Sequence, residues 1–460
     1  MLVAKLVLLG LLGQVPGEQA DPSAIAAQLG SRRYAEREAA SETLERLGRS
    51  ALPALRAARD SRDLEIRNRA YGLIHKIEGA LLTQASQVRL QFENTPLVEV
   101  MQSFSQQTGF KVALIPENVP KWKNQRVTLR QAEPLPFWKA IDQLCDVAQL
   151  QYNLPMYGVV GPREPAFGLN DGSMRTLTPN SDHGPFRVSL LSVDYERHVS
   201  YASVGVGPGS RPPLNDGFMR RPPASSPPKL NPQTNELFTA NLLVAAEPRL
   251  SLSQAGTLQV LEAVDNLNNT LIASGNRGQV LNRFTSTLGM GWVVQLQAPL
   301  HRPATAGETI KRLRGVIPLS VSSRHPDPLV VPLDQGTGKR FENPAVELTI
   351  HDIRTMPNTP QTLIELSVKP KDRGTTAESP ESEAFNDIYR RDLQRIQLEV
   401  LDSRGQIVPA FASVVNSETA HLTLSLINLQ AFASLKELRY YTLTRATVSV
   451  PFEFKDIPMP

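Results

Sequence analysis

Residues 88–152 switch repeatedly between two spacings of apolar residues, and this switching constrains the fold more than any other feature of the chain. Apolar residues three and four positions apart predict a helix from Leu97 to Gly109 and a second helix from Phe137 to Ala148. Gly109 is the residue type that commonly ends a helix in the left-handed conformation. Alternating apolar residues predict short strands at 88–92, 110–114, 127–129 and 150–152. This order of elements predicts one small α/β module.

The segment VRLQFENTPLVEVMQSFSQQTGFKVAL (88–114) resembles the opening of the short N-terminal domain shared by secretins and TonB-dependent receptors, the STN or secretin N0 type. The segment VTLRQAEPLPFWKAIDQLCDVAQLQY (127–152) resembles the second half of that domain. The resemblance implies an STN-like module over 85–154 that binds other envelope proteins and has no catalytic centre. Long barrel strands do not follow it in the sequence, so we do not expect a secretin pore or a TonB-type barrel.

A helical unit is expected before this module, over residues 21–82. The segment REAASETLERLGRSALPALRAARDSRDLEIRNRAYGLIHKI (37–77) resembles a HEAT-type repeat, including its Leu-Gly pair and the proline in its second helix. It covers little more than one repeat, and repeat proteins need about three to bury a continuous core. We therefore expect this unit to cap or dock onto another part of the protein.

Strands dominate the remainder, and the whole chain is expected to be α+β and multidomain. A linker is expected over 155–183, followed by a β-sandwich-like domain over 184–300 and a second one over 301–460. Short apolar strands around turn clusters such as Asp265–Asn269 and Asp402–Gly405 favour antiparallel sandwiches. Two further segments are expected to be disordered or mobile, namely the Pro/Gly/Ser-rich insertion 203–235 and the acidic loop 372–388.

The N-terminus has the pattern of a signal peptide over residues 1–20. Lys5 precedes a short apolar run that is too short to span a bilayer. Cleavage is expected after Gly17 or, less favourably, after Ala20. No other apolar run approaches the length of a transmembrane segment, so the mature chain is expected to be periplasmic or secreted. The alternative is a buried N-terminal helix.

The charge composition of the chain limits which classes of partner are expected. Lys and Arg total 49 against 45 Asp and Glu, and this small, dispersed surplus argues against a nucleic-acid partner. Residues 49–76 are locally basic, which is compatible either with a solvated helical face or with contact to an anionic polymer. The single cysteine, Cys145, is expected to pack as a small apolar residue.

We predict no catalytic, cofactor-binding or metal-binding residues, and no cofactor. The glycines of Gly205–Gly209 are followed by Arg-Pro-Pro, which forbids the helix that a dinucleotide site requires. The seven histidines are scattered, although folding could still assemble a metal site. Adjacent pairs such as Asp182-His183 and His351-Asp352 are expected to point to opposite faces of a strand. Glu247 and Arg249 are expected to form a surface ion pair, with a ligand role as the alternative.

These observations favour a non-catalytic exported protein of a bacterial envelope that binds other proteins or envelope polymers, in a scaffold or assembly role. An envelope protein partner is expected, but the sequence does not identify it. The alternatives are an envelope-polymer hydrolase and a carbohydrate-binding protein, each with its site in the β-domains.

Overall fold

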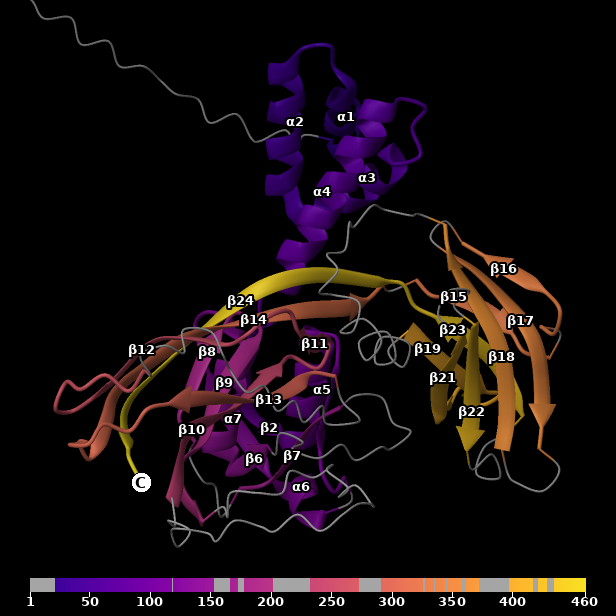
Figure 1. Cartoon of the computed structure of the whole chain (residues 1–460). Coiled ribbons are helices and arrows are strands. Elements are labelled where there is room, and N and C mark those ends of the chain that lie inside the picture. The colour runs from indigo at the N-terminus through magenta and orange to yellow at the C-terminus, as the bar shows by residue number, and fades with distance from the viewer. Residues whose placement is uncertain are drawn as a thin grey trace, which may run out of the picture. The chain divides into compact units, whose positions relative to one another are not determined.

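The computed structural model describes residues 21–117, 119–152, 166–172, 178–201, 232–272, 291–325, 327–334, 336–343, 346–356, 361–371, 397–416, 421–427 and 434–460. The chain divides into two units, one comprising Met1–Gln84 with Thr444–Ala446 and the other comprising Ala85–Leu443 with Thr447–Pro460. Helices build the first unit, whereas antiparallel strands dominate the second (Figure 1). The chain is therefore multidomain, as expected, and mostly β. The predicted signal peptide lies outside the described residues.

Amphipathic helices form the first unit. Asp21 and Asp63 cap two of them by accepting hydrogen bonds from the backbone N–H groups of Ser23 (2.9 Å) and Glu65 (2.8 Å). The apolar faces meet in one core that includes Leu44, Leu55 and Ile77. The helices are α1 (Pro22–Ala27), α2 (Tyr34–Leu47), α3 (Leu52–Ala58) and α4 (Leu64–Leu82), with 3₁₀ turns η1 (Gln28–Gly30) and η2 (Gly48–Ala51).

The second unit begins with the α/β module, defined here as residues 85–171. Its strands pair as β1-β5, β2-β4 and β3-β7-β6. Gly109 ends α5 with φ of 76°, which confirms the expected left-handed cap. The elements are β1 (Gln87–Val88), β2 (Gln91–Pro96), α5 (Leu97–Thr108), β3 (Lys111–Leu114), α6 (Pro120–Asn124), β4 (Arg126–Arg130), β5 (Leu135–Pro136), α7 (Phe137–Ala148), β6 (Leu150–Tyr152) and β7 (Ala166–Asp171).

Two boundaries of this region differ from expectation. The strand expected at 88–92 is split, because β1 pairs with β5 whereas β2 pairs with β4. The expected linker 155–183 contains β7, which lies parallel to β3 and antiparallel to β6. Phe167 and Leu169 of β7 are buried in the module's core. This strand is a structural part of the module, and its burial offsets the weak strand preference of its glycine and asparagine.

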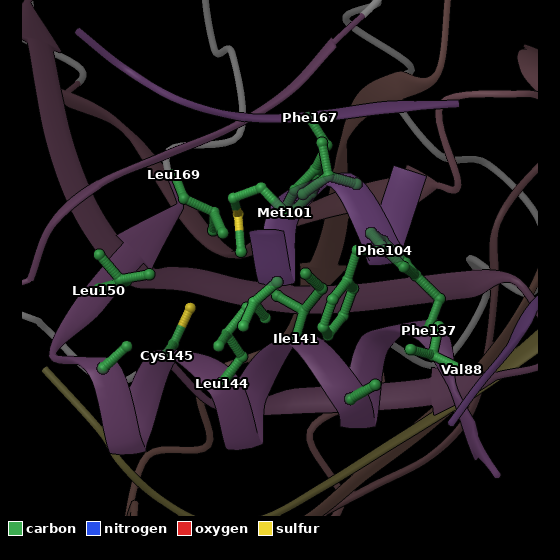
Figure 2. Close-up of a cluster of buried hydrophobic side chains, with 14 of the residues drawn as sticks. Val88, Met101, Phe104, Phe137, Ile141, Leu144, Cys145, Leu150, Phe167 and Leu169 are labelled. Atoms are coloured by element: carbon green, nitrogen blue, oxygen red, sulfur yellow. The ribbon is translucent and has the colours of Figure 1, made fainter. Parts of the chain in front are cut away.

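The core of the module lies between α7, α5 and the β3-β7-β6 sheet. Figure 2 shows Ile141, Leu144 and Cys145 of α7 facing Met101 and Phe104 of α5. Cys145 is 1% exposed, which confirms that it packs as an apolar residue. The same core cluster contains residues from later strands, namely Leu243, Ala245, Trp292 and Val293. The module therefore shares its core with the strands that follow it.

The first strand set comprises two sheets. One has the order β13-β10-β9-β8, and the other has the order β11-β14-β12 with β24 paired to β14. The expected domain boundary at residue 300 is wrong, because β14 pairs with the earlier strands β11 and β12. The strands are β8 (Asn180–His183), β9 (Phe186–Tyr201), β10 (Pro232–Ala246), β11 (Ser251–Gln254), β12 (Gln259–Asp265), β13 (Val293–Leu300), β14 (Thr309–Arg324) and β24 (Leu443–Pro458).

The second strand set also comprises two sheets, with the orders β16-β17-β18-β22-β21 and β15-β23-β19-β20. Their apolar residues meet in one core that includes Ile350, Leu366 and Leu424. The strands are β15 (Leu329–Pro332), β16 (Arg340–Glu342), β17 (Val346–Thr355), β18 (Gln361–Pro370), β19 (Leu398–Asp402), β20 (Ile407–Val408), β21 (Ala410–Asn416), β22 (His421–Ile427) and β23 (Leu435–Tyr440).

Three other expectations concern segments rather than elements. The insertion expected at 203–235 lies outside the described residues up to 231, and its last four residues belong to β10. The acidic loop 372–388 also lies outside them. Within the described residues, none of the helices combines the length and the apolar character that crossing a bilayer requires.

Candidate functional site

A buried arginine joins the α/β module to the first strand set. Arg187 of β9 is 1% exposed. It donates two hydrogen bonds of 2.7 Å to the carboxylate of Asp182, and further bonds of 2.8 and 2.6 Å to the two oxygens of Asp142 on α7. It also donates to the hydroxyl of Tyr152, and its guanidinium lies 4.9 Å from the ring centre of Trp138. Side chains from α7, β6, β8 and β9 therefore converge on one cation.

The charge of this arginine is fully compensated. Burial alone would lower the pKa of Arg187, but hydrogen bonds to Asp182 and Asp142 raise it above its usual value. Burial also raises the pKa of Tyr152 to about 12, so its hydroxyl stays protonated at neutral pH. Charge-assisted bidentate pairs fix geometry as well as energy. The cluster therefore positions the module on the strands.

Glu247 makes a second contact between the module and the strands. The expectation of a surface ion pair is wrong, because the Glu247 side chain is 0% exposed. Its oxygens accept hydrogen bonds from Ser86 N (2.7 Å), Ser86 Oγ (2.6 Å) and Arg249 Nε (2.7 Å). Ser86 lies immediately before β1. The main partner is thus far away in the sequence, where no local pattern can show it.

Two of the scattered histidines meet on the β16-β17-β18-β22-β21 sheet. The rings of His351 (β17) and His421 (β22) have centroids 4.9 Å apart. Ser367 of β18 lies between them, because it is the register partner of His421 and its Oγ is 3.0 Å from His351 Nε2. His351 is exposed and the other two are half-buried. We call these three residues the imidazole pair and its serine.

A β-bulge explains why this cluster escapes the sequence pattern. The register of β17 and β18 shifts between Ile350 and Asp352, so His351 has no partner across the strands. A bulge breaks the simple alternation of side chains between faces. The rule that we applied to His351 and Asp352 assumes regular alternation. The cluster also depends on three strands that are separated in the sequence, so spacing alone cannot reveal it.

The aspartates of the two turn clusters have a structural role. Asp265 and Asp402 are buried and accept backbone N–H groups within their own turns, as in the bonds from Asn269 (2.7 Å) and Gln406 (2.8 Å). Burial would raise the pKa of Asp265, but hydrogen bonds from Asn269, Gly307 and Leu267 lower it below its usual value. These carboxylates therefore stabilise turns. The glycines of 205–209 lie outside the described residues.

Three of the seven basic side chains at 49–76 form local ion pairs. Arg56, Arg69 and Lys76 contact glutamates of the same unit at 3.0, 2.9 and 2.7 Å. Surface pairs of this kind contribute little stability, but they reduce the net positive field. An anionic-polymer contact through this face stays a proposal.

No group of three or more His, Cys, Asp or Glu side chains that could hold a metal ion occurs among the described residues. Comparisons with protein-family models, with characterised proteins and with solved structures find no match for this chain.

Proposed function

We propose that the chain is an exported, non-catalytic scaffold protein of a bacterial envelope that binds other proteins or envelope polymers. In this proposal the helical unit is HEAT-like, the α/β module is STN-like and the two strand sets are β-sandwich-like domains. One observation carries the binding role, namely the contrast between the two edges of the β16-β17-β18-β22-β21 sheet.

The β16 edge is guarded by charge. Arg340 of β16 forms ion pairs with Glu347 (2.5 Å) and Glu342 (3.6 Å), and Lys371 forms another with Glu342 (2.9 Å). The strand is only three residues long. Short, charged edge strands resist pairing with strands of other molecules. This edge is therefore a poor site for capturing a partner.

The β21 edge lacks that protection. Its sequence, Ala-Phe-Ala-Ser-Val-Val-Asn, contains no charge and no proline over seven residues. Within the described part of the chain it pairs with β22 alone. Its Ser413 is exposed. Because an edge strand of this kind can accept an extended segment as an added strand, β21 supports capture of a partner's strand by backbone hydrogen bonds.

A peptide-display selection on the full chain tests this binding mode. We expect extended peptides to be enriched, and Ser413→Lys to weaken their binding by about tenfold, because a lysine on an edge strand opposes pairing. Thr349→Lys places the same charge inside the same sheet and should leave binding unchanged. Equal binding by the wild type and Ser413→Lys would remove the support for strand capture.

Export has its own test. We expect mass spectrometry of the native protein from a periplasmic fraction to show a chain that begins after Gly17 or Ala20. An intact Met1 in a cytoplasmic fraction would contradict both export and the envelope role.

A further inference from the structure

The two strand sets repeat one arrangement of strands. In sheet order, β8, β9, β10 and β13 correspond to β16, β17, β18 and β22. Asn180, the first residue of β8, lies opposite Ser189 of β9, and Arg340, the first residue of β16, lies opposite Thr349 of β17. The strands that end at the turn residues Asp265 and Asp402 also correspond, because β12 pairs with β14 and β19 pairs with β23, both antiparallel.

Irregularities recur at equivalent positions, which makes the correspondence specific. In the first set, the register shifts beside the pair Leu242–Leu190, and Leu191 is left unpaired. In the second set, it shifts beside the pair Leu366–Ile350, and His351 is left unpaired. The register also shifts immediately before Asp265 and before Asp402. The two sets therefore share one strand arrangement, including the position of the bulge and of the turn carboxylate.

This correspondence assigns a counterpart to each member of the imidazole pair and its serine. His351 corresponds to Leu191, the unpaired residue of the first strand set. Ser367 corresponds to Leu243, and His421 corresponds to Gln295, because each follows from the pairs flanking the bulge.

In the first strand set, two of these positions pack against the core of the α/β module. Leu243 is 3% exposed and belongs to the module's core cluster, and Leu191 packs against that cluster. In the second strand set the same positions carry a hydroxyl and an imidazole, and a second imidazole joins them from β22. The positions that contact the α/β module in the first strand set therefore carry polar side chains in the second strand set. Burying these side chains against an apolar module would be unfavourable.

We propose that this cluster is a binding site for a divalent transition-metal ion, with His351 and His421 as its ligands. Neutral imidazole is the commonest metal ligand among side chains. The two strands that carry the pair are separated by β18, a spacing of about 10 Å between backbones, which two converging histidine side chains can bridge. Water completes the coordination, as in open metal sites.

Ser367 has a positioning role in this site. Its Oγ contacts His351 Nε2, so the other ring nitrogen, Nδ1, is left for the metal. Metal-binding histidines characteristically direct their second nitrogen to such a partner, which fixes the tautomer and the ring orientation. The flanking charges are already paired, since Arg340 contacts Glu347 and Arg354 contacts Glu365.

Titration of the untagged full chain with CuCl₂, NiCl₂ or ZnCl₂ tests the proposal. We expect one ion per chain, with Cu²⁺ bound most tightly, and a Cu²⁺ electron paramagnetic resonance spectrum that reports imidazole nitrogens. His351→Gln and His421→Gln should each weaken binding at least tenfold. Ser367→Ala should weaken it by about tenfold while the stoichiometry is kept, as expected for an outer partner of a ligand.

His75→Gln is the matched control, because it removes an exposed imidazole from the helical unit and should leave binding unchanged. Circular dichroism of each variant checks that the fold is retained. Unchanged affinity and stoichiometry in the double variant His351→Gln/His421→Gln would overturn the proposal. So would failure of the wild type to bind any of the three ions.

Discussion

At the scale of single residues, two charged side chains are buried where the α/β module meets the first strand set. Arg187 and Glu247 have almost no exposed side-chain area, and each contacts the α/β module from the first strand set. A buried ion pair can be replaced by apolar residues at little cost, but removing one partner leaves an uncompensated charge. The two contacts therefore fix which surfaces of the module and strands meet.

Arg187→Met should destabilise the protein by about 3–5 kcal/mol, because it leaves two carboxylates near a core without their cation. The matched control is Arg197→Met on the same strand, since Arg197 forms an exposed pair with Glu236 at 3.5 Å, and its loss should change stability little. Urea unfolding monitored by tryptophan fluorescence measures both variants. Equal midpoints for the two variants would show that the buried cluster does not stabilise the junction.

At the scale of elements, local patterns predict what lies close in sequence and miss what pairs at a distance. Helical spacing predicts α5 and α7, and alternation predicts β4, because each buries one face. The start of α5 is less regular, since its N-cap is Pro96 and makes no side-chain cap hydrogen bond. Strand β7 and the imidazole pair escape prediction because both depend on partners brought in by folding.

The hairpin of β9 and β10 makes a clear prediction. Tyr201 and Pro232 are register partners, so the ends of the two strands lie opposite each other. A two-residue Asn-Gly turn can join such strands. Replacing residues 202–231 with Asn-Gly should shift the melting midpoint by no more than a few degrees, measured by differential scanning calorimetry. A large drop would mean that the replaced segment contributes to the packing.

At the scale of the whole molecule, two strand sets with one arrangement have different neighbours. The first strand set shares a core with the α/β module, through Leu243 and Trp292 among others. The second strand set has its own core and a polar face at the matching position. Short strands around turn clusters in the sequence predict two β-sandwich-like domains, but the strand arrangement that they share is visible only in the register.

Leu243→Asp should disturb the module as well as β10, because it places an unpaired charge in their shared core. We expect faster hydrogen exchange in both α7 and β10. Ser367→Asp introduces the same charge at the corresponding position of the second strand set, where the side chain is half-buried and lies outside the core cluster, and should leave β18 protected. If α7 stays as protected in Leu243→Asp as in the wild type, the module and the strands are not energetically coupled.

The single buried cysteine, Cys145, is a natural probe of local opening in the α/β module (Figure 2). Cys145 sits among the side chains of α7, α5 and β7, so a thiol reagent can reach it only when that core opens. With no second thiol in the sequence, every labelling event reports the same place. The labelling rate of Cys145 therefore reports how often the core of the α/β module opens in the unmodified chain, without any engineered probe.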